Sequence, residues 1–179
     1  MVDLIDLRPG MNHAWLTTPG ADLGHTSVFG SLVTGGSLSV LEESRSVDGK
    51  ALGALAPDVL KVAPSHLRAL LGTGDPKEVL PRDRLVLGGE SLPPGLLEEV
   101  HACRPDLQVF NHYGPTETTV GVVAQACSFA PQERLPIGRP LAHAAAYVVD
   151  PSGGLVAEGV AGELWVGGPS LAEGYQGRA

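Results

Sequence analysis

The sequence predicts an α/β fold, with a parallel sheet and flanking helices followed by a smaller antiparallel β portion. The first observation is that short apolar runs alternate with helical patterns over residues 37–110. The second is a change after about Val120, where β-prone runs follow one another without helical patterns between them. The third is that 24 glycines and 15 prolines divide the 179 residues into many short elements.

The alternating part contains four apolar runs of strand length, at residues 37–41, 58–63, 84–87 and 107–110. Two helices are expected between them, at residues 65–71 and 93–102. Each helix has a proline in its first turn and three apolar side chains spaced to form one buried stripe. Apolar strands separated by helices are typical of a parallel sheet that is covered by helices.

The later part contains β-prone runs separated by turn residues, at residues 120–126, 144–149, 155–156 and 162–166. The segment Asp150-Pro151-Ser152-Gly153-Gly154 is a strong turn signal between two of them. These short spacings indicate hairpins rather than parallel units. We therefore expect an α/β portion over residues 1–135 and a β-rich portion over residues 136–179.

Composition excludes several classes of protein. A formal net charge of -8 and the lack of a basic stripe argue against nucleic-acid binding. No apolar run approaches the ~20 residues of a membrane helix, and the three charges within residues 1–10 do not suit a signal peptide. Two cysteines make no disulfide scaffold, so we expect a cytoplasmic protein.

The segment Asn111 to Thr119, NHYGPTETT, follows the last strand of the alternating part. Ligand sites of α/β sheets lie at such strand ends. Its hydroxyl and backbone N–H groups suit a phosphate, and the Glu117 carboxylate suits Mg²⁺. The alternative is an ordinary helix start with Thr116 as the cap and Glu117 in the first turn. The local chemistry leaves both interpretations open.

Three further positions each allow a structural and a functional interpretation. The glycines of Leu87-Gly88-Gly89-Glu90-Ser91 either approach a flat ligand or form a strand-to-helix turn. Asp22 either caps a helix that runs through Leu32 or faces a cationic ligand group. Lys61 interrupts an apolar strand, so its ammonium either reaches water at a strand end or points into a pocket.

Other catalytic patterns do not appear in the sequence. The six histidines have no metal-ligand spacing. There is no GxSxG elbow, and neither cysteine is placed as a nucleophile.

The segment Asn111-His112-Tyr113-Gly114-Pro115-Thr116-Glu117 resembles the NxYGPTE core motif of nonribosomal peptide synthetase adenylation domains, in the adenylate-forming, AMP-binding superfamily. Residues 162–168, GELWVGG, followed by Gly174-Tyr175, resemble the next core motif, GELxIGGxGxARGY. The segments Ile137–Pro140 and Leu87–Glu90 match the family in order and separation. The resemblance covers nearly the whole chain and implies a partial N-terminal core of that fold. Residues 1–135 would be its second α/β subdomain, and residues 136–179 the start of its distorted β-barrel.

The resemblance also implies roles for single residues. Asn111 and Tyr113 would hold the adenine of ATP, with Gly88, Gly89 and Glu90 as the wall beside it. Thr116 would contact the α-phosphate, and Glu117 would help bind Mg²⁺. The implied reaction joins an amino-acid carboxylate to the α-phosphorus of ATP and releases pyrophosphate. The aminoacyl group would then pass to the phosphopantetheine thiol of a carrier protein.

The family selects its amino acid through a set of pocket residues. By alignment these would be Asp22, Leu23, Thr26, Lys61, Val86, Gly88, His112, Val120 and Gly121. Asp22 would pair with the substrate α-ammonium, and the rest of the set resembles the pattern for aspartate. Lys61 and His112 would then face the side-chain carboxylate, in a charge-assisted pairing.

The sequence departs from the family pattern in places. The usual aromatic residue before Asp22 is missing, and Leu171 and Glu173 stand where valine and arginine are usual. The glycine-rich phosphate loop, the ribose-binding aspartate and the C-terminal domain with its catalytic lysine have no counterpart in these residues. We therefore expect the second half of an adenylation core, which would not form an adenylate alone. The alternative is a non-catalytic remnant that serves as a structural or binding module.

Overall fold

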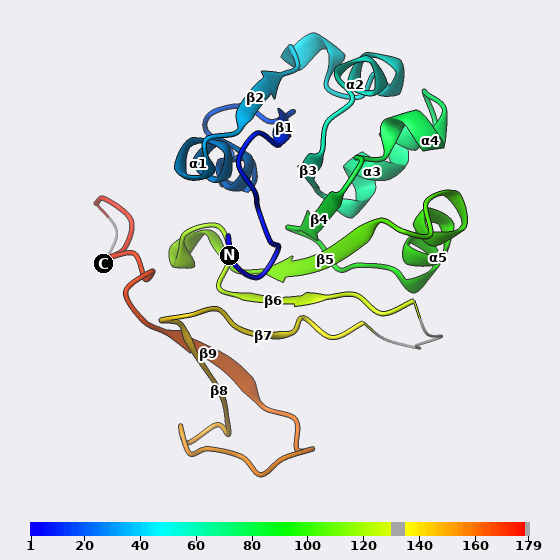
Figure 1. Ribbon diagram of the computed structural model, residues 1–179. Helices are drawn as coiled ribbons and strands as arrows, with labels where there is room; N and C mark the ends of the chain where they lie inside the picture. Colours follow the sequence, from blue (N-terminus) through cyan, green and yellow to red (C-terminus); the bar gives the residue numbers. More distant parts are fainter. Residues whose placement is uncertain (130–134, 178–179) are drawn as a thin grey trace.

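The computed structural model describes residues 1–129 and 135–177, and its larger sheet has seven strands in the order β2-β1-β3-β4-β5-β6-β7 (Figure 1). Its strands are β1 (Asn12–Trp15), β2 (Ser37–Val40), β3 (Val59–Val62), β4 (Arg84–Gly88), β5 (Gln108–Tyr113), β6 (Val123–Ala126) and β7 (Arg139–Pro140). The neighbours among β1 to β5 are parallel, whereas β6 and β7 are antiparallel to their neighbours. The mostly parallel sheet confirms the predicted fold class.

A separate hairpin of β8 (Ala145–Val149) and β9 (Glu163–Gly167) forms the small antiparallel sheet. It projects beyond β7 at the lower edge of Figure 1. The turn signal at Asp150 is confirmed, since its carboxylate accepts hydrogen bonds from the backbone N–H groups of Ser152 and Gly154. The domain boundary near residue 135 stays a prediction, because β7 still pairs with the large sheet.

The described helices lie between the strands, as α1 (His25–Thr34), α2 (Gly49–Leu55), α3 (Pro64–Leu71), α4 (Pro76–Val79) and α5 (Pro94–Cys103). There are also single 3₁₀ turns, η1 (Asp22–Gly24), η2 (Glu43–Arg45) and η3 (Thr116–Thr118). Both predicted helices with a first-turn proline are confirmed as α3 and α5. No helix in the described residues is long and apolar enough to cross a membrane.

The two faces of the sheet are covered differently. Leu60, Leu85 and Val109 pack with apolar side chains of α2, α3, α4 and α5 in the larger core. Val59, Val86 and Phe110 point to the opposite face and pack against Ile5, Leu7 and Met11 of the N-terminal segment. Because side chains alternate along a strand, this second face also receives Lys61 and His112. The site is therefore built on the face that the N-terminal segment and α1 cover.

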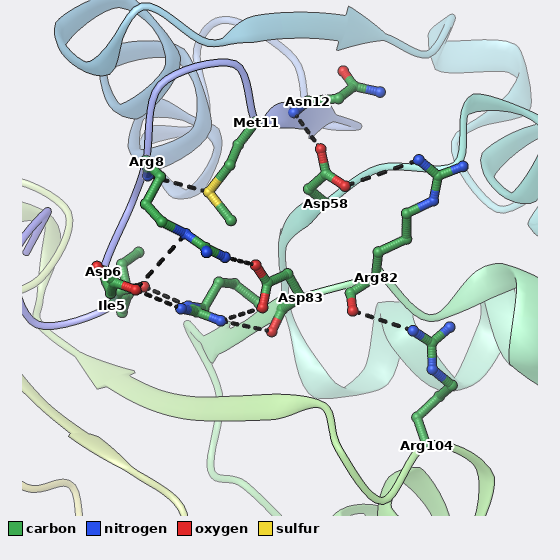
Figure 2. Close-up of polar contacts among 10 residues, drawn as sticks. Ile5, Asp6, Arg8, Met11, Asn12, Asp58, Arg82, Asp83 and Arg104 are labelled. Atoms are coloured by element: carbon green, nitrogen blue, oxygen red, sulfur yellow. Dashed lines mark hydrogen bonds and ion pairs between the residues drawn. The ribbon is translucent and has the colours of Figure 1, made fainter.

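An arginine at the start of β4 holds the N-terminal segment in place. The Arg84 guanidinium is buried, and its Nε donates to the carbonyl oxygen of Ile5 at 2.6 Å. Its Nη atoms contact the carboxylates of Asp6 and Asp83, and Arg8 contacts Asp83 as well (Figure 2). A buried guanidinium needs such partners, because an unpaired buried charge is strongly destabilising. This network lies at the amino end of the strand, away from the site.

Candidate functional site

Three neighbouring parallel strands place the site residues in register. Lys61 on β3 pairs with Val86 on β4, and Val86 pairs with Phe110 on β5. His112 lies two residues beyond Phe110 and therefore projects from the same face. Gly88 on β4 pairs with His112 on β5, and as a glycine it has no side chain that would fill the space next to His112. The carboxyl ends of these strands form the floor of the site.

Lys61 and His112 make the central polar contact of the site. The Lys61 side chain is only 3% exposed and that of His112 only 4%. Lys61 Nζ contacts His112 Nδ1 and lies 3.5 Å from the hydroxyl oxygen of Thr26. The alternative in which Lys61 reaches water is therefore wrong, because β3 lies inside the sheet between β1 and β4. In the sequence, one lysine within an apolar strand marked this position as unusual. The strand order of the sheet decides that the lysine is buried.

Burial sets the charge state of this pair. Desolvation lowers the pKa of Lys61 to about 7, although the carboxylate of Asp22 opposes the change. Desolvation and the nearby Lys61 charge lower the pKa of His112 to about 3. His112 is thus neutral and accepts from Lys61 at Nδ1, which places its own proton on Nε2. The pair carries at most one positive charge.

The other nitrogen of His112 lies against the backbone of Gly121, and hydrogen bonding to that backbone raises the histidine pKa in opposition to burial. Nε2 is buried, and a Cβ atom added at Gly121 would lie only 2.3 Å from it. The two residues before Gly121 are held in an unusual conformation, since Thr119 has φ 59° and Val120 φ 69°. Such strain in β-branched residues costs on the order of 1–3 kcal/mol each and is concentrated at functional sites.

A cavity of about 230 Å³ opens above His112. Thr26, Val120 and Gly121 from the predicted pocket line it, together with His112. The remaining walls were not predicted and come from Met1, Val2, Leu7, His25, Phe29, Gly30, Val33 and Thr119. The i, i+4 spacing of His25, Phe29 and Val33 on α1 is a signal that could have found three of them.

The other predicted pocket residues lie around this cavity rather than on its lining. Asp22 begins η1 and is close enough to Lys61 for its charge to raise the lysine pKa. Its side chain caps no helix, so the capping alternative is wrong. Val86 is fully buried beneath the cavity in the apolar core. Leu23 lies beside Gly89, since a Cβ atom added at Gly89 would be 3.6 Å from Leu23 Cδ1.

A second cavity of about 440 Å³ adjoins the first, and His112 lines both. Its walls include four residues that the resemblance assigns to adenine, namely Gly89, Glu90, Asn111 and Tyr113. The Glu90 carboxylate is turned toward α3, where it accepts from the backbone N–H and hydroxyl of Ser65. Those two bonds lower the pKa of Glu90. Gly88 lies behind the wall, against the carbonyl oxygen of His112.

Asn111 is oriented by Pro136, a contact that the sequence did not predict. Its Nδ2 donates to the carbonyl oxygen of Pro136 at 2.9 Å. This leaves Oδ1 as an acceptor for an exocyclic amino group, which is what adenine presents. Leu135 and Ile137 beside Pro136 also line the cavity and were not predicted, although Ile137 begins a family-like segment.

Thr116 and Glu117 lie in the exposed turn η3, outside the lining of both cavities. Thr116 makes no capping bond, and the cap position is Pro115, so the capping alternative for Thr116 is wrong. Oε1 of Glu117 accepts from the Tyr175 hydroxyl at 3.0 Å. No group of three metal-ligating side chains occurs in the described residues. A single carboxylate still fits Mg²⁺, which keeps several waters and is shared with substrate phosphates.

Comparison with known proteins shows the family of the chain. The family model described as AMP-binding enzyme matches residues 4–176. Phosphinothricin tripeptide synthetase PhsB of Streptomyces viridochromogenes is 36% identical over 162 residues, which is 88% of this chain. The AMB antimetabolite synthetase AmbE of Pseudomonas aeruginosa is 41% identical over 145 residues, or 78% of this chain.

Solved structures share the fold. An NRPS protein that contains adenylation and PCP domains, bound to a vinylsulfonamide inhibitor, matches 96% of this chain with a TM-score of 0.88 and 26% identity. A four-domain nonribosomal peptide synthetase bound to AMP and glycine matches 99% with a TM-score of 0.84 and 30% identity. The chain spans 14% and 7% of the two synthetases named first, and 31% and 13% of the two solved chains.

Proposed function

The chain belongs to the AMP-binding enzyme family, and on that premise we propose that it forms the adenine and amino-acid pockets of an adenylation domain that activates L-aspartate. One oxygen of the amino-acid α-carboxylate attacks the α-phosphorus of ATP. The bond from that phosphorus to the bridging oxygen breaks, and pyrophosphate leaves. The product is the mixed anhydride aminoacyl-AMP, formed for nonribosomal peptide synthesis.

The observation that carries the aspartate assignment is the buried contact between Lys61 and His112. Lys61 itself does not line the cavity of about 230 Å³, but it contacts His112 and Thr26, which do. A buried ammonium at this position needs a counter-charge, and a side-chain carboxylate would supply one. His112, which lines this cavity, would provide a second contact for the same group. Asp22, whose charge acts on Lys61, would pair with the substrate α-ammonium. Aspartate has both charges at this short separation.

The adjoining cavity would hold the nucleotide. Asn111 presents Oδ1, Tyr113 offers an aromatic face, and Gly89 allows a flat ring to approach the backbone. Thr116 would donate its hydroxyl to the α-phosphate. Glu117 would hold Mg²⁺, which neutralises phosphate charge when bound. Because His112 lines both cavities, an amino acid and a nucleotide held in them would be neighbours.

The aminoacyl group would then move to the thiol of a carrier protein. One solved relative contains both an adenylation domain and a PCP domain, which supports this partner class. The transfer breaks the anhydride bond, releases AMP and forms a thioester.

Amino-acid-dependent ATP–pyrophosphate exchange by the complete adenylation domain tests the proposal. We expect exchange with aspartate, much weaker exchange with glutamate, and almost none with asparagine. Glutamate keeps the charge but adds a methylene, which costs roughly 10–200-fold in such pockets. Asparagine leaves Lys61 buried without a counter-charge, and such mismatches cost ~10⁴-fold or more. AMP binding without exchange for any amino acid would indicate the non-catalytic remnant instead.

A further inference from the structure

The segment of residues 168–175 returns to the turn η3 and lies against it. The backbone N–H of Ala172 donates to the carbonyl oxygen of Glu117 at 2.7 Å. The hydroxyl of Thr119 donates to the carbonyl oxygen of Ser170 at 2.8 Å. These two bonds anchor the segment to the middle of η3 and to the residue that follows it. Tyr175 follows directly, and its hydroxyl reaches Oε1 of Glu117 at 3.0 Å, from 58 residues further along the chain.

This hydroxyl contact restricts a carboxylate that would otherwise be mobile. Glu117 is exposed, and a free glutamate side chain samples many rotamers at a cost of up to about 2 kcal/mol when it is ordered. The Tyr175 hydroxyl donates to one oxygen and leaves the lone pairs of the other oxygen free. The side chain is thereby held in one orientation with an acceptor atom available.

The chemical nature of the donor matters as well. A phenol is neutral, so it orients the carboxylate without cancelling its negative charge. Among the described residues, no lysine, arginine or histidine forms an ion pair with Glu117. A carboxylate that keeps its charge and is oriented by a neutral donor suits a divalent cation. Partners of this kind raise metal affinity by fixing the ligand before the metal arrives.

We infer that Tyr175 is a positioning residue that holds the Glu117 carboxylate for a divalent cation bound with ATP. The inference rests on the proposed function, because it takes Glu117 as the metal-holding carboxylate. The competing explanation is that Tyr175 only ties down residues 168–175. In that case its hydroxyl would affect stability and not the affinity for the metal.

The test compares Tyr175→Phe and Glu117→Gln with the unchanged complete domain. Tyr147→Phe is the matched control, since Tyr147 is a half-exposed tyrosine on β8 outside both cavities. Mn²⁺ is the probe, and electron paramagnetic resonance measures its dissociation constant in the presence of ATP. Exchange activity is measured across Mg²⁺ concentrations, and thermal unfolding is measured for every variant.

We expect Tyr175→Phe to weaken Mn²⁺ binding about tenfold and to raise the half-maximal Mg²⁺ concentration by a similar factor. Exchange at saturating Mg²⁺ and the KM for the amino acid should change little, and Tyr147→Phe should match the unchanged domain. If Tyr175→Phe lowers only the unfolding temperature while Glu117→Gln weakens Mn²⁺ binding, the positioning role is wrong and the metal role of Glu117 stands. If neither variant alters Mn²⁺ binding, the metal role of Glu117 fails, and the role of Tyr175 fails with it.

Discussion

Lys61 on β3 and His112 on β5 contact each other across β4, with the lysine Nζ against the histidine Nδ1. The two groups share one positive charge, because the buried histidine stays neutral and accepts from the ammonium. No local sequence pattern predicts this contact, because the two residues are 51 positions apart in the sequence. The contact holds the Lys61 amine beside His112, which lines the small cavity, and the first prediction follows from that.

Replacing Lys61 with alanine should abolish the preference of the complete domain for aspartate over asparagine. The variant loses the only side chain proposed to supply a full positive charge to the substrate carboxylate. His112→Ala should weaken the preference less, because a neutral imidazole supplies a hydrogen bond rather than a charge. The measurement is kcat/KM for pyrophosphate exchange with each amino acid. An unchanged ratio in Lys61→Ala would remove the aspartate assignment, whereas AMP binding should persist in both variants.

The affinity for aspartate should fall as the pH rises through about 7, where Lys61 loses its proton in the free site. Asp22 is the charged group that acts on Lys61, and the contacting His112 is neutral, so the lysine dominates this pH dependence. The KM for aspartate should rise between pH 6 and pH 8.5, while the KM for asparagine should not rise, because loss of the Lys61 proton removes the unpaired charge that disfavours asparagine. A flat aspartate profile would contradict a functional role for the Lys61 charge.

The same ionisation should make folding stability rise with pH above 7. The unfolded chain keeps the lysine protonated up to its ordinary pKa of 10.5, whereas the folded chain releases the proton at about 7. The unfolded state therefore binds more protons between these values, and stability increases with pH across that window. Urea unfolding of the unchanged chain and of Lys61→Met measures the effect. The difference between the two should shrink from pH 7 to pH 10, and a constant difference would count against a depressed pKa.

Gly121→Ala should damage the amino-acid cavity, because the new Cβ would lie 2.3 Å from His112 Nε2. The imidazole would have to move away from Lys61, so aspartate binding and thermal stability should both fall. Gly95→Ala in α5 is the matched control, since a Cβ there has no atom within 4 Å. Alanine in a helix should raise stability by up to about 1 kcal/mol. Calorimetry of both variants checks the contrast, and equal effects would show that Gly121 has no special contact.

Asn111→Ala should reduce AMP affinity by roughly tenfold, the equivalent of about 1.4 kcal/mol for a lost buried hydrogen bond. Gln125→Ala is the control, because Gln125 also donates to the carbonyl oxygen of Pro136, at 3.1 Å. If Asn111 only supported Pro136, both variants would bind AMP equally poorly. Isothermal titration with AMP separates the two cases.

The elements that were missed are those with weak local patterns. β1 has the sequence Asn-His-Ala-Trp, which lacks an apolar run, yet it lies between β2 and β3. α2 contains two glycines, and α4 is a single turn capped by Asp75. The run at 120–126 begins as a strand only at Val123, because Thr119 and Val120 take left-handed conformations first. In the predicted run at 155–156, only Leu155 pairs, in one isolated bridge with Val149, and no strand forms.

The sequence by itself determined the order of the main strands and helices, because apolar periodicity and proline or glycine punctuation are local signals. It also determined the family, through the segment from Asn111 to Glu117. Only the tertiary structure decided that Lys61 is buried against His112, that Pro136 orients Asn111 and that Tyr175 reaches Glu117. Each of these contacts depends on strand order, register or a returning segment. Such long-range geometry sets burial and charge, and no local pattern of residues encodes it.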